Sequence, residues 1–142
     1  MSAESNTKLV RDFYAKMSAL DFDGMFALMA DDATWTVAGN PKTFHHAGVA
    51  TKAQRREAFG NFTQFFATLE MDVRSTTAQD DRVAAELITR CATHSGLEYE
   101  NELLVVIRCH DGRIVNIYEH LDQQTALDFD RRLAASMGQG GH

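Results

Sequence analysis

The sequence is poor in the features that mark membrane and secreted proteins. Its 142 residues include one proline, Pro41, and two cysteines, Cys91 and Cys109, whose separation matches no metal or redox motif. Its apolar runs are short, whereas a membrane-spanning helix needs about 20 consecutive apolar residues. The polar first residues, MSAESNTK, lack the apolar stretch of a signal peptide. These absences predict a cytoplasmic protein without a membrane span.

The chain also lacks an excess of positive charge. Its net charge is -6 at pH 7, and its densest basic points, Arg55-Arg56 and Arg131-Arg132, lie beside acidic residues. Proteins that bind nucleic acid carry clustered positive charge, so we expect no nucleic-acid partner. The length and the 44% hydrophobic content predict one globular domain over residues 1–137, followed by a disordered tail over 138–142.

Apolar residues recur at helical spacing in three segments of the first half. They are Leu9, Val10, Phe13, Tyr14, Met17 and Leu20 in the first, Met25, Phe26, Leu28 and Met29 in the second, and Phe59, Phe62 and Phe66 in the third. Ser5 or Thr7 is the expected cap of the first helix, and Asp21 or Asp23 that of the second. Thr51 with Gln54 forms a capping-box pattern that begins the third helix.

The remaining patterns predict strands and one more helix. Residues 34–38 fit a strand, and 39–48 an irregular loop. From Leu69 onward the apolar period is two. Turns at Asp80-Asp81, Ser95-Gly96 and Asp111-Gly112 then separate four strands of an antiparallel meander, before a final helix over about 123–135. This order predicts an α+β fold whose helices lie on one face of the sheet.

The last hairpin can be registered in two ways. A two-residue loop at Asp111-Gly112 would pair His110 with Arg113 and mix apolar with polar side chains on one face. A three-residue loop, with Gly112 in a left-handed bulge position, would pair Cys109 with Arg113 and separate the two kinds of residue better. We therefore predict the second register. It places Leu103, Val105, Ile107, Val115, Ile117 and Leu121 on the inner face, with Leu103 opposite Glu119 and Asn101 opposite Leu121.

The preceding turn, at Ser95-Gly96, sets how the strand that contains Asn101 pairs with the strand before it. Similar reasoning there places Cys91 opposite Asn101, with Leu87 and Thr89 on the inner face. Cys109 would then lie too far along the strand from Cys91 for a disulfide, which requires Cα atoms within about 7 Å. We predict two free thiols.

Two segments carry a resemblance to a known family: LVRDFYAKMSALDFDGMFALMADDATW from Leu9 to Trp35, and YENELLVVIRCHDGRIVNIYEHLD from Tyr99 to Asp122. They resemble the nuclear-transport-factor-2-like cone fold and, within it, SnoaL-like polyketide cyclases and ketosteroid-isomerase-like proteins. The resemblance implies a cone-shaped curved sheet, mixed or antiparallel, wrapped by three N-terminal helices and followed by a short C-terminal helix. The fold hosts isomerases, cyclases, dehydratases, epoxide hydrolases and non-catalytic binders.

The residues that ketosteroid isomerases use are missing from this sequence. Alignment on ADDAT places Phe13 where those enzymes carry a catalytic tyrosine, with Tyr14 one step away. Val37 stands at the position of their base aspartate and Val105 near that of their second acid. Because these three residues are missing, we reject the ketosteroid isomerase reaction. The Asp-Arg-Asp trio of limonene epoxide hydrolases has no match either.

The acids at the end of the last strand fit the SnoaL-like pattern, in which an aspartate in that neighbourhood acts as acid/base. Glu119 on an apolar wall would have a raised pKa and would suit proton abstraction beside a carbonyl. Alternatively, it is a structural carboxyl bonded to Tyr14, a histidine or an arginine. Asp122 is the alternative acid/base, or a cap for the final helix. Asn101 would orient a ligand carbonyl or hold Glu119.

His45 and His46 lie on the loop expected over the mouth of the pocket, with His46 as a third catalytic candidate. Adjacent histidines do not readily share one metal ion, so we predict no metal and no cofactor. The predicted ligand-binding set is Phe13, Tyr14, Met17, Trp35, Val37, His45, Phe59, Phe62, Asn101, Leu103 and Ile117. The apolar members are alternatively plain core.

The outer face of the predicted sheet is too apolar to face water, since it carries Ile88, Leu104, Val106, Ile114 and Tyr118. The final helix or a second subunit should cover it, and we predict a homodimer. Two functions stay open. The first is a cofactor-independent isomerase, cyclase or dehydratase acting on a small apolar carbonyl compound. The second is a non-catalytic ligand-binding or dimerisation module.

Overall fold

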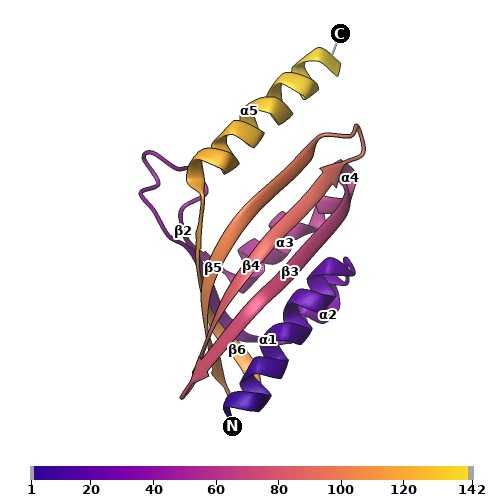
Figure 1. The fold of residues 1–142 in the computed structure, drawn as a ribbon. Helices are drawn as coiled ribbons and strands as arrows, with labels where there is room; N and C mark the ends of the chain where they lie inside the picture. The colour runs from indigo at the N-terminus through magenta and orange to yellow at the C-terminus, as the bar shows by residue number, and fades with distance from the viewer. Residues whose placement is uncertain (1, 141–142) are drawn as a thin grey trace.

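A computed structural model describes residues 2–140 as five helices and six strands (Figure 1). In chain order these are α1 (Ala3–Ser18), α2 (Phe22–Ala27), β1 (Met29–Val37), β2 (Gly48–Thr51), α3 (Lys52–Gly60), α4 (Phe62–Phe65), β3 (Phe66–Gln79), β4 (Arg82–Thr93), β5 (Glu98–His110), β6 (Arg113–Leu121) and α5 (Gln123–Gly140). The predicted α+β class is confirmed. Within the described residues, no helix is long and apolar enough to cross a membrane.

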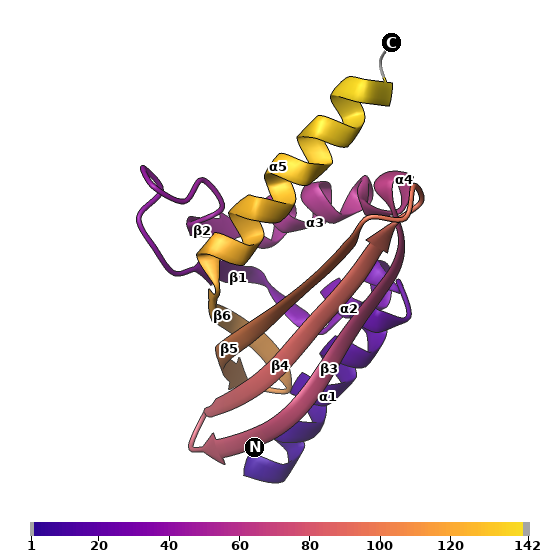
Figure 2. The ribbon, with the colours of Figure 1, turned by 45° about the horizontal axis from the view of Figure 1, so that its top comes forward.

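The six strands form one mixed sheet in the order β2-β1-β6-β5-β4-β3. The predicted meander of β3 to β6 is confirmed, and β1 joins it by pairing parallel to β6. The short strand β2 was not predicted. The sheet twists without curling strongly into a cone, contrary to the expectation from the resemblance (Figure 2). The ladder between β4 and β5 is unbroken from Arg82 to Ala92, so it lacks the bulges that bend a sheet sharply.

The helix boundaries differ from the prediction in several places. Ser2 caps α1, and Ser5 completes the capping box from the third helical position. Asp21 caps α2 as predicted, but the helix ends at Ala27 because Met29 already pairs in β1. The Thr51–Gln54 capping box is confirmed at α3. The expected third helix is divided into α3 and α4 at Asn61.

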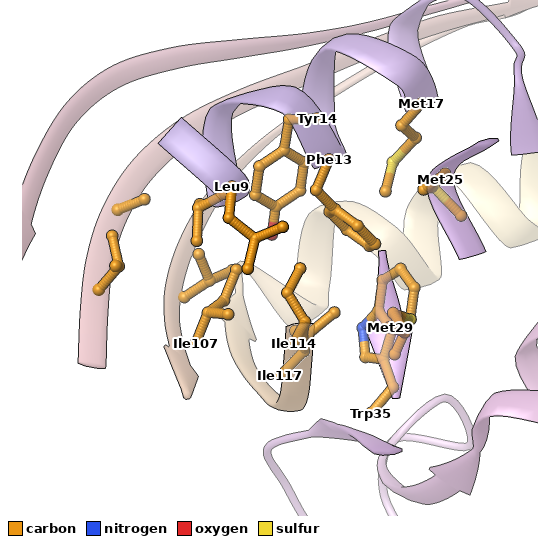
Figure 3. Packing of buried hydrophobic residues seen from close by; sticks show 14 of the residues in the cluster. Leu9, Phe13, Tyr14, Met17, Met25, Met29, Trp35, Ile107, Ile114 and Ile117 are labelled. Carbon is orange, nitrogen blue, oxygen red and sulfur yellow. The ribbon is translucent and has the colours of Figure 1, made fainter. Parts of the chain in front are cut away.

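The main core fills the space between the helices and the inner face of the sheet. Alternate residues of β4 and β5 are buried there: Val83, Ala85, Leu87, Leu103, Val105, Ile107 and Cys109. From α1, Phe13 and Tyr14 point into this cluster above Ile107, Ile114 and Ile117 (Figure 3). Each large apolar side chain buried in this way contributes about 1.5–3 kcal/mol.

The β5–β6 hairpin combines both registers considered from the sequence. The loop is the two-residue one, with His110 opposite Arg113, because Asp111 and Gly112 both adopt the positive φ that such a turn requires. A bulge then leaves Val115 unpaired and shifts the strand by one residue. The predicted three-residue loop is therefore wrong.

The bulge returns the apolar residues of the upper hairpin to the predicted inner face. Glu119 lies opposite Val105 rather than Leu103, and Leu103 lies opposite Leu121. At the base of the hairpin Ile114 is fully buried and Val115 is not, the reverse of the prediction. The inner-face residues away from the turn were therefore predicted correctly. The bulge was not predicted, because the alternation pattern assumes a regular strand.

The β4–β5 register is shifted by two residues from the prediction, because the turn is centred on Ser95, one residue earlier than expected. Thr89 lies opposite Asn101, and Cys91 lies opposite Tyr99. A shift of two preserves the face, so the inner-face assignment of Leu87 and Thr89 is confirmed. Both cysteines are free thiols, as predicted.

The last helix does not cover the outer face of the sheet. Leu104, Val106 and Tyr118 are 57%, 39% and 42% exposed there. The prediction that the final helix covers this face is therefore wrong. Helix α5 instead buries Ala126 and Phe129 at the end of the inner face, beside the β1–β2 loop (Figure 2). It is not short and continues to Gly140, where a disordered tail was predicted from residue 138; residues 141–142 lie outside the described part.

Candidate functional site

Glu119 lies on the inner face of β6, within the apolar wall. Its strand neighbours are Val105 on β5 and Val37 on β1. The indole Nε1 of Trp35 donates a hydrogen bond of 2.8 Å to Glu119 Oε1. The carboxyl is half-buried, and Trp35 itself is buried. The predicted inward orientation of Glu119 therefore agrees with the structure.

Burial raises the pKa of Glu119, although the hydrogen bond from Trp35 and the charge of Arg55 act in the opposite direction. The guanidinium of Arg55 lies over the Trp35 ring, 5.0 Å from its centroid. Burial lowers the pKa of Arg55, and the Glu119 charge partly reverses that effect. A carboxyl with a raised pKa thus lies near a cation that remains charged at neutral pH.

Two polar atoms close to this carboxyl have unused hydrogen-bonding capacity. Tyr14 Oη and Arg55 Nε are buried and have no hydrogen-bond partner among the described residues. Burial, and then the charge of Glu119, raise the pKa of Tyr14 well above its usual value, so its phenol is neutral. Buried polar groups are normally paired, and an unpaired one indicates a role beyond packing or an unseen partner.

A row of aromatic rings extends from this group toward α5. Centroid separations of 4.6 to 6.3 Å connect Trp35, Phe59, Phe62, Phe66, Phe129 and Tyr99 in sequence. Phe59, Phe62 and Phe66 are only partly buried, unlike the core rings. Partly exposed aromatic rings beside a few polar groups are typical of surfaces that receive apolar ligands.

The deeper members of the predicted lining are closed off from solvent. Phe13, Met17 and Ile117 belong to the main core cluster, and Leu103 packs with them. Val37 lies in a second small cluster with Phe44 and Ala126, under the start of α5. The structure thus separates the predicted set into core residues and residues, such as Phe59 and Phe62, that reach the surface.

Asn101 is buried and its hydrogen bonds are internal. Its Nδ2 donates to Tyr99 Oη at 2.6 Å and to the Asp122 carbonyl at 2.9 Å, and its Oδ1 accepts from the Asp122 N–H at 3.2 Å. These bonds connect β5 to the residue that precedes α5. Asn101 makes no hydrogen bond to Glu119, and both of its amide donors are used.

Asp122 is exposed and caps α5. Its carboxylate accepts from Thr125 N–H at 3.3 Å and from Thr125 Oγ1 at 2.7 Å. These bonds lower its pKa, with the hydroxyl bond the larger cause. The arrangement is that of a helix cap.

His45 and His46, on the β1–β2 loop, interact with α5. His46 Nε2 donates to Asp130 Oδ2 at 2.7 Å, and His45 Nε2 lies 3.3 Å from the same oxygen. The structure therefore groups the two histidines with Asp130, a residue that the sequence analysis did not single out.

Residues 10–117, most of the chain, match the family described as SnoaL-like domain. The chain belongs to the SnoaL-like family. The match confirms the resemblance found from the sequence segments around Trp35 and in β5 and β6. A search of curated proteins matched none of them.

Solved structures agree on the fold of this SnoaL-like chain. PrhC from Penicillium brasilianum is 20% identical, with a TM-score of 0.85 over 95% of this chain and 91% of that one. BvnE pinacolase from Penicillium brevicompactum is 18% identical, with a TM-score of 0.82 over 94% and 97%. IdmH, a putative polyketide cyclase from Streptomyces antibioticus, is 21% identical, with a TM-score of 0.72 over 87% and 96%. Identities this low establish the SnoaL-like fold alone.

Arg55 and Asp130 were not among the candidate residues predicted from the sequence of this SnoaL-like chain. Arg55 is four residues before Phe59, and helical neighbours at that spacing share a face. That spacing was a usable signal. Asp130 offered no comparable signal, because the path of α5 determines what it contacts.

Proposed function

We propose that this protein is a cofactor-independent acid/base enzyme with Glu119 as the acid/base. The substrate class is a small apolar molecule with a carbonyl group, and the reaction class is isomerisation, cyclisation or dehydration. The observation that carries the proposal is a half-buried carboxyl with a raised pKa, beside two buried polar atoms that have no hydrogen-bond partner within residues 2–140. Perturbed carboxyls in such surroundings are typical of general acids and bases.

In the proposed step, ionised Glu119 removes a proton from the carbon between the carbonyl and a C=C bond of the substrate. The electron pair of that C–H bond moves to the carbonyl oxygen and forms an enolate conjugated with the C=C bond. The protonated Glu119 then returns the proton at the far carbon of that bond, which moves the double bond and completes an isomerisation without a cofactor. Trp35 Nε1 holds the carboxyl in place through its hydrogen bond.

The enolate oxygen requires hydrogen-bond donors, and the unpaired Tyr14 Oη–H and Arg55 Nε–H are the available ones among the described residues. The aromatic row of Phe59, Phe62 and Phe66 supports an apolar substrate skeleton. That a pinacolase and a putative polyketide cyclase have this fold supports chemistry on carbon skeletons as a class. We leave Asp122 as a helix cap, since its lowered pKa makes it a weak base at neutral pH.

A non-catalytic binding or dimerisation module is the second candidate. It is favoured by the closed core beneath Phe13 and by the exposed apolar outer face. A hollow of about 440 Å³ on that face is lined by Ile88, Leu104 and His120, among others. On this alternative a second copy of the chain or a small ligand covers the outer face, and Glu119 has only a structural role.

Proton exchange distinguishes the two candidates without knowledge of the natural substrate. Small apolar ketones in D₂O exchange the hydrogens next to the carbonyl, and NMR follows that exchange. We expect the protein to accelerate exchange, and Glu119→Gln to reduce the acceleration by at least about 100-fold. Asp122→Asn is the matched control and should retain most of it.

Binding of the same ketones is measured separately by titration calorimetry. Glu119→Gln should still bind them, because the glutamine retains an oxygen acceptor for Trp35 Nε1. Equal exchange rates in the wild type and Glu119→Gln would overturn the proposal. Binding without any acceleration by the wild type would favour the second candidate.

A further inference from the structure

The β1–β2 loop and α5 bring three potential metal ligands together outside the Glu119 site. One ligand atom each from His45, His46 and Asp130 lies within 4.8 Å of the other two. The imidazole rings lie side by side, with centroids 4.0 Å apart and planes inclined by 41°. Both Nε2 atoms approach the same carboxylate oxygen, Asp130 Oδ2.

We propose that His45, His46 and Asp130 bind one divalent transition-metal ion, through the two Nε2 atoms and the carboxylate. Two imidazoles with one carboxylate form a donor set suited to Zn²⁺, Co²⁺ or Ni²⁺. Three protein ligands leave at least one position for water. The proposal is independent of the function proposed for Glu119.

The distances fit an ion of this class with little adjustment. Bonds of about 2.0–2.2 Å place neighbouring ligand atoms of a tetrahedral ion roughly 3.3 Å apart. His45 Nε2 is 3.3 Å from Asp130 Oδ2. His46 Nε2 is 2.7 Å from it, a hydrogen-bond distance, so this pair must separate by roughly half an ångström when an ion replaces the bond.

The backbone on both sides of the cluster is held by buried neighbours. Phe44, next to His45, is buried in a cluster with Val37 and Ala126, and its ring contacts the His46 ring at 5.3 Å. Asp130 lies one turn after Ala126 on α5, and both therefore face the loop. A site whose ligands are positioned before binding loses less conformational entropy when the ion arrives.

The loop itself is also ordered by its own hydrogen bonds. The N–H groups of Thr43 and Phe44 donate to the Asn40 carbonyl, and Ala47 N–H donates to the Phe44 carbonyl. The turn they define presents successive imidazoles toward α5. Adjacent histidines were not expected to share one ion readily, but this turn brings the two imidazole rings side by side.

The cluster is accessible, and the nearest arginines are engaged elsewhere. The side chains of His45, His46 and Asp130 are 64%, 47% and 33% exposed. Arg131 pairs with Asp128 at 2.7 Å, and Arg132 donates to the Glu98 carbonyl at 3.0 Å. Neither takes the Asp130 carboxylate from the histidines, and the chain's net charge of -6 favours cations.

Titration of the untagged chain with Zn²⁺ tests the site, since an affinity tag would bind the ion itself. We expect calorimetry to show one saturable equivalent, and Co²⁺ to give the visible absorption of a low-symmetry site with nitrogen ligands. His45→Ala, His46→Ala and Asp130→Asn should each weaken binding by at least about tenfold, because even the partners of metal ligands contribute that much. Zn²⁺ should also raise the Tm of the wild type, and EDTA should reverse the rise.

His110 supplies the matched control, because it forms an exposed pair with Asp111 at 3.2 Å without a second imidazole. His110→Ala should bind Zn²⁺ as the wild type does. Circular dichroism without metal confirms that each variant is folded. The proposal is overturned if no saturable equivalent binds, if His110→Ala weakens binding as much as His46→Ala does, or if His45→Ala leaves the affinity unchanged.

Discussion

The two faces of strands β5 and β6 share one backbone but have opposite surroundings. On the inner face Val105 and Ile107 are buried against α1 and the other core residues. On the outer face their neighbours Leu104 and Val106 are exposed. The same apolar residue types therefore stabilise the fold on one face and remain free for association on the other.

The acids of this region show the same contrast within three residues. Burial raises the pKa of Glu119 on the inner face, whereas hydrogen bonds from Thr125 lower that of Asp122 beyond the strand end. The intrinsic pKa values of the two residue types differ by only about 0.4 units. Surroundings rather than residue type therefore decide which acid suits proton transfer near neutral pH.

The largest effect on stability is expected on the inner face. Ile107→Ala should lower the free energy of unfolding by about 2–5 kcal/mol, because it leaves a cavity in a closed core. Val106→Ala on the outer face is the matched control and should change it by less than about 1 kcal/mol. Urea denaturation measures both. Equal losses would contradict the assignment of the two faces.

The Glu119 contribution to stability should depend on pH. Folding raises the pKa, so the native state binds this proton more tightly than the unfolded chain does. This contribution is fully present below the unfolded-state pKa, and it is lost as the pH rises through the folded-state pKa. Glu119→Gln should therefore gain stability relative to the wild type as the pH rises above the ordinary glutamate pKa of about 4.3. Thermal unfolding across that range would show a flat or declining difference if the prediction were wrong.

Asp122 should give the opposite slope with a smaller amplitude. Its folded-state pKa is lowered, so its contribution is present above the unfolded pKa and is lost as the pH falls through the folded one. Asp122→Asn should lower the Tm at neutral pH and have little effect under strongly acidic conditions. A Tm difference that grows on acidification would exclude the cap role. Gln124→Ala, in the same helix turn, controls for general effects of substitution.

The smallest effect on unfolding is expected from a charge on the outer face. If a second copy of the chain covers this face, as its apolar residues predict, Leu104→Lys should leave the monomer folded and shift the association equilibrium toward monomer by at least tenfold. Sedimentation velocity at several concentrations measures this shift. Glu102→Lys, on the same face of β5, is the control for charge alone. A wild-type chain that remains monomeric at every concentration would contradict the predicted dimer.

The β5–β6 hairpin shows which structural features alternation in the sequence can predict and which it cannot. Alternation along β5 predicted that Leu103, Val105 and Ile107 face inward, and they do. The same alternation led to the wrong loop length, because we assumed that the loop length alone decides which side chains face inward. Asp111 and Gly112 favoured a two-residue turn, burial favoured the other register, and a bulge at Val115 satisfies both.

The site was predictable to a similar depth. Strand alternation placed Glu119 in the apolar wall, and the capping pattern located α3. Tyr14 and an arginine were named from the sequence as possible partners of Glu119, but the hydrogen bond comes from Trp35, because β1 pairs parallel to β6. Which arginine lies near the carboxyl depends on how α3 packs on the sheet. Asp130 meets His46 across 84 positions of sequence, a separation that no local pattern spans.

The sequence by itself determined the α+β class, the order of the main elements, the inner face of the sheet and the family, because each depends on periodicity or on local motifs. Tertiary structure alone decided the bulge, the path of α5, the pKa shifts of Glu119 and Asp122, and the meeting of two histidines with Asp130. These depend on distances between segments remote in the chain, and such distances are set by packing the whole molecule rather than by any single stretch of it.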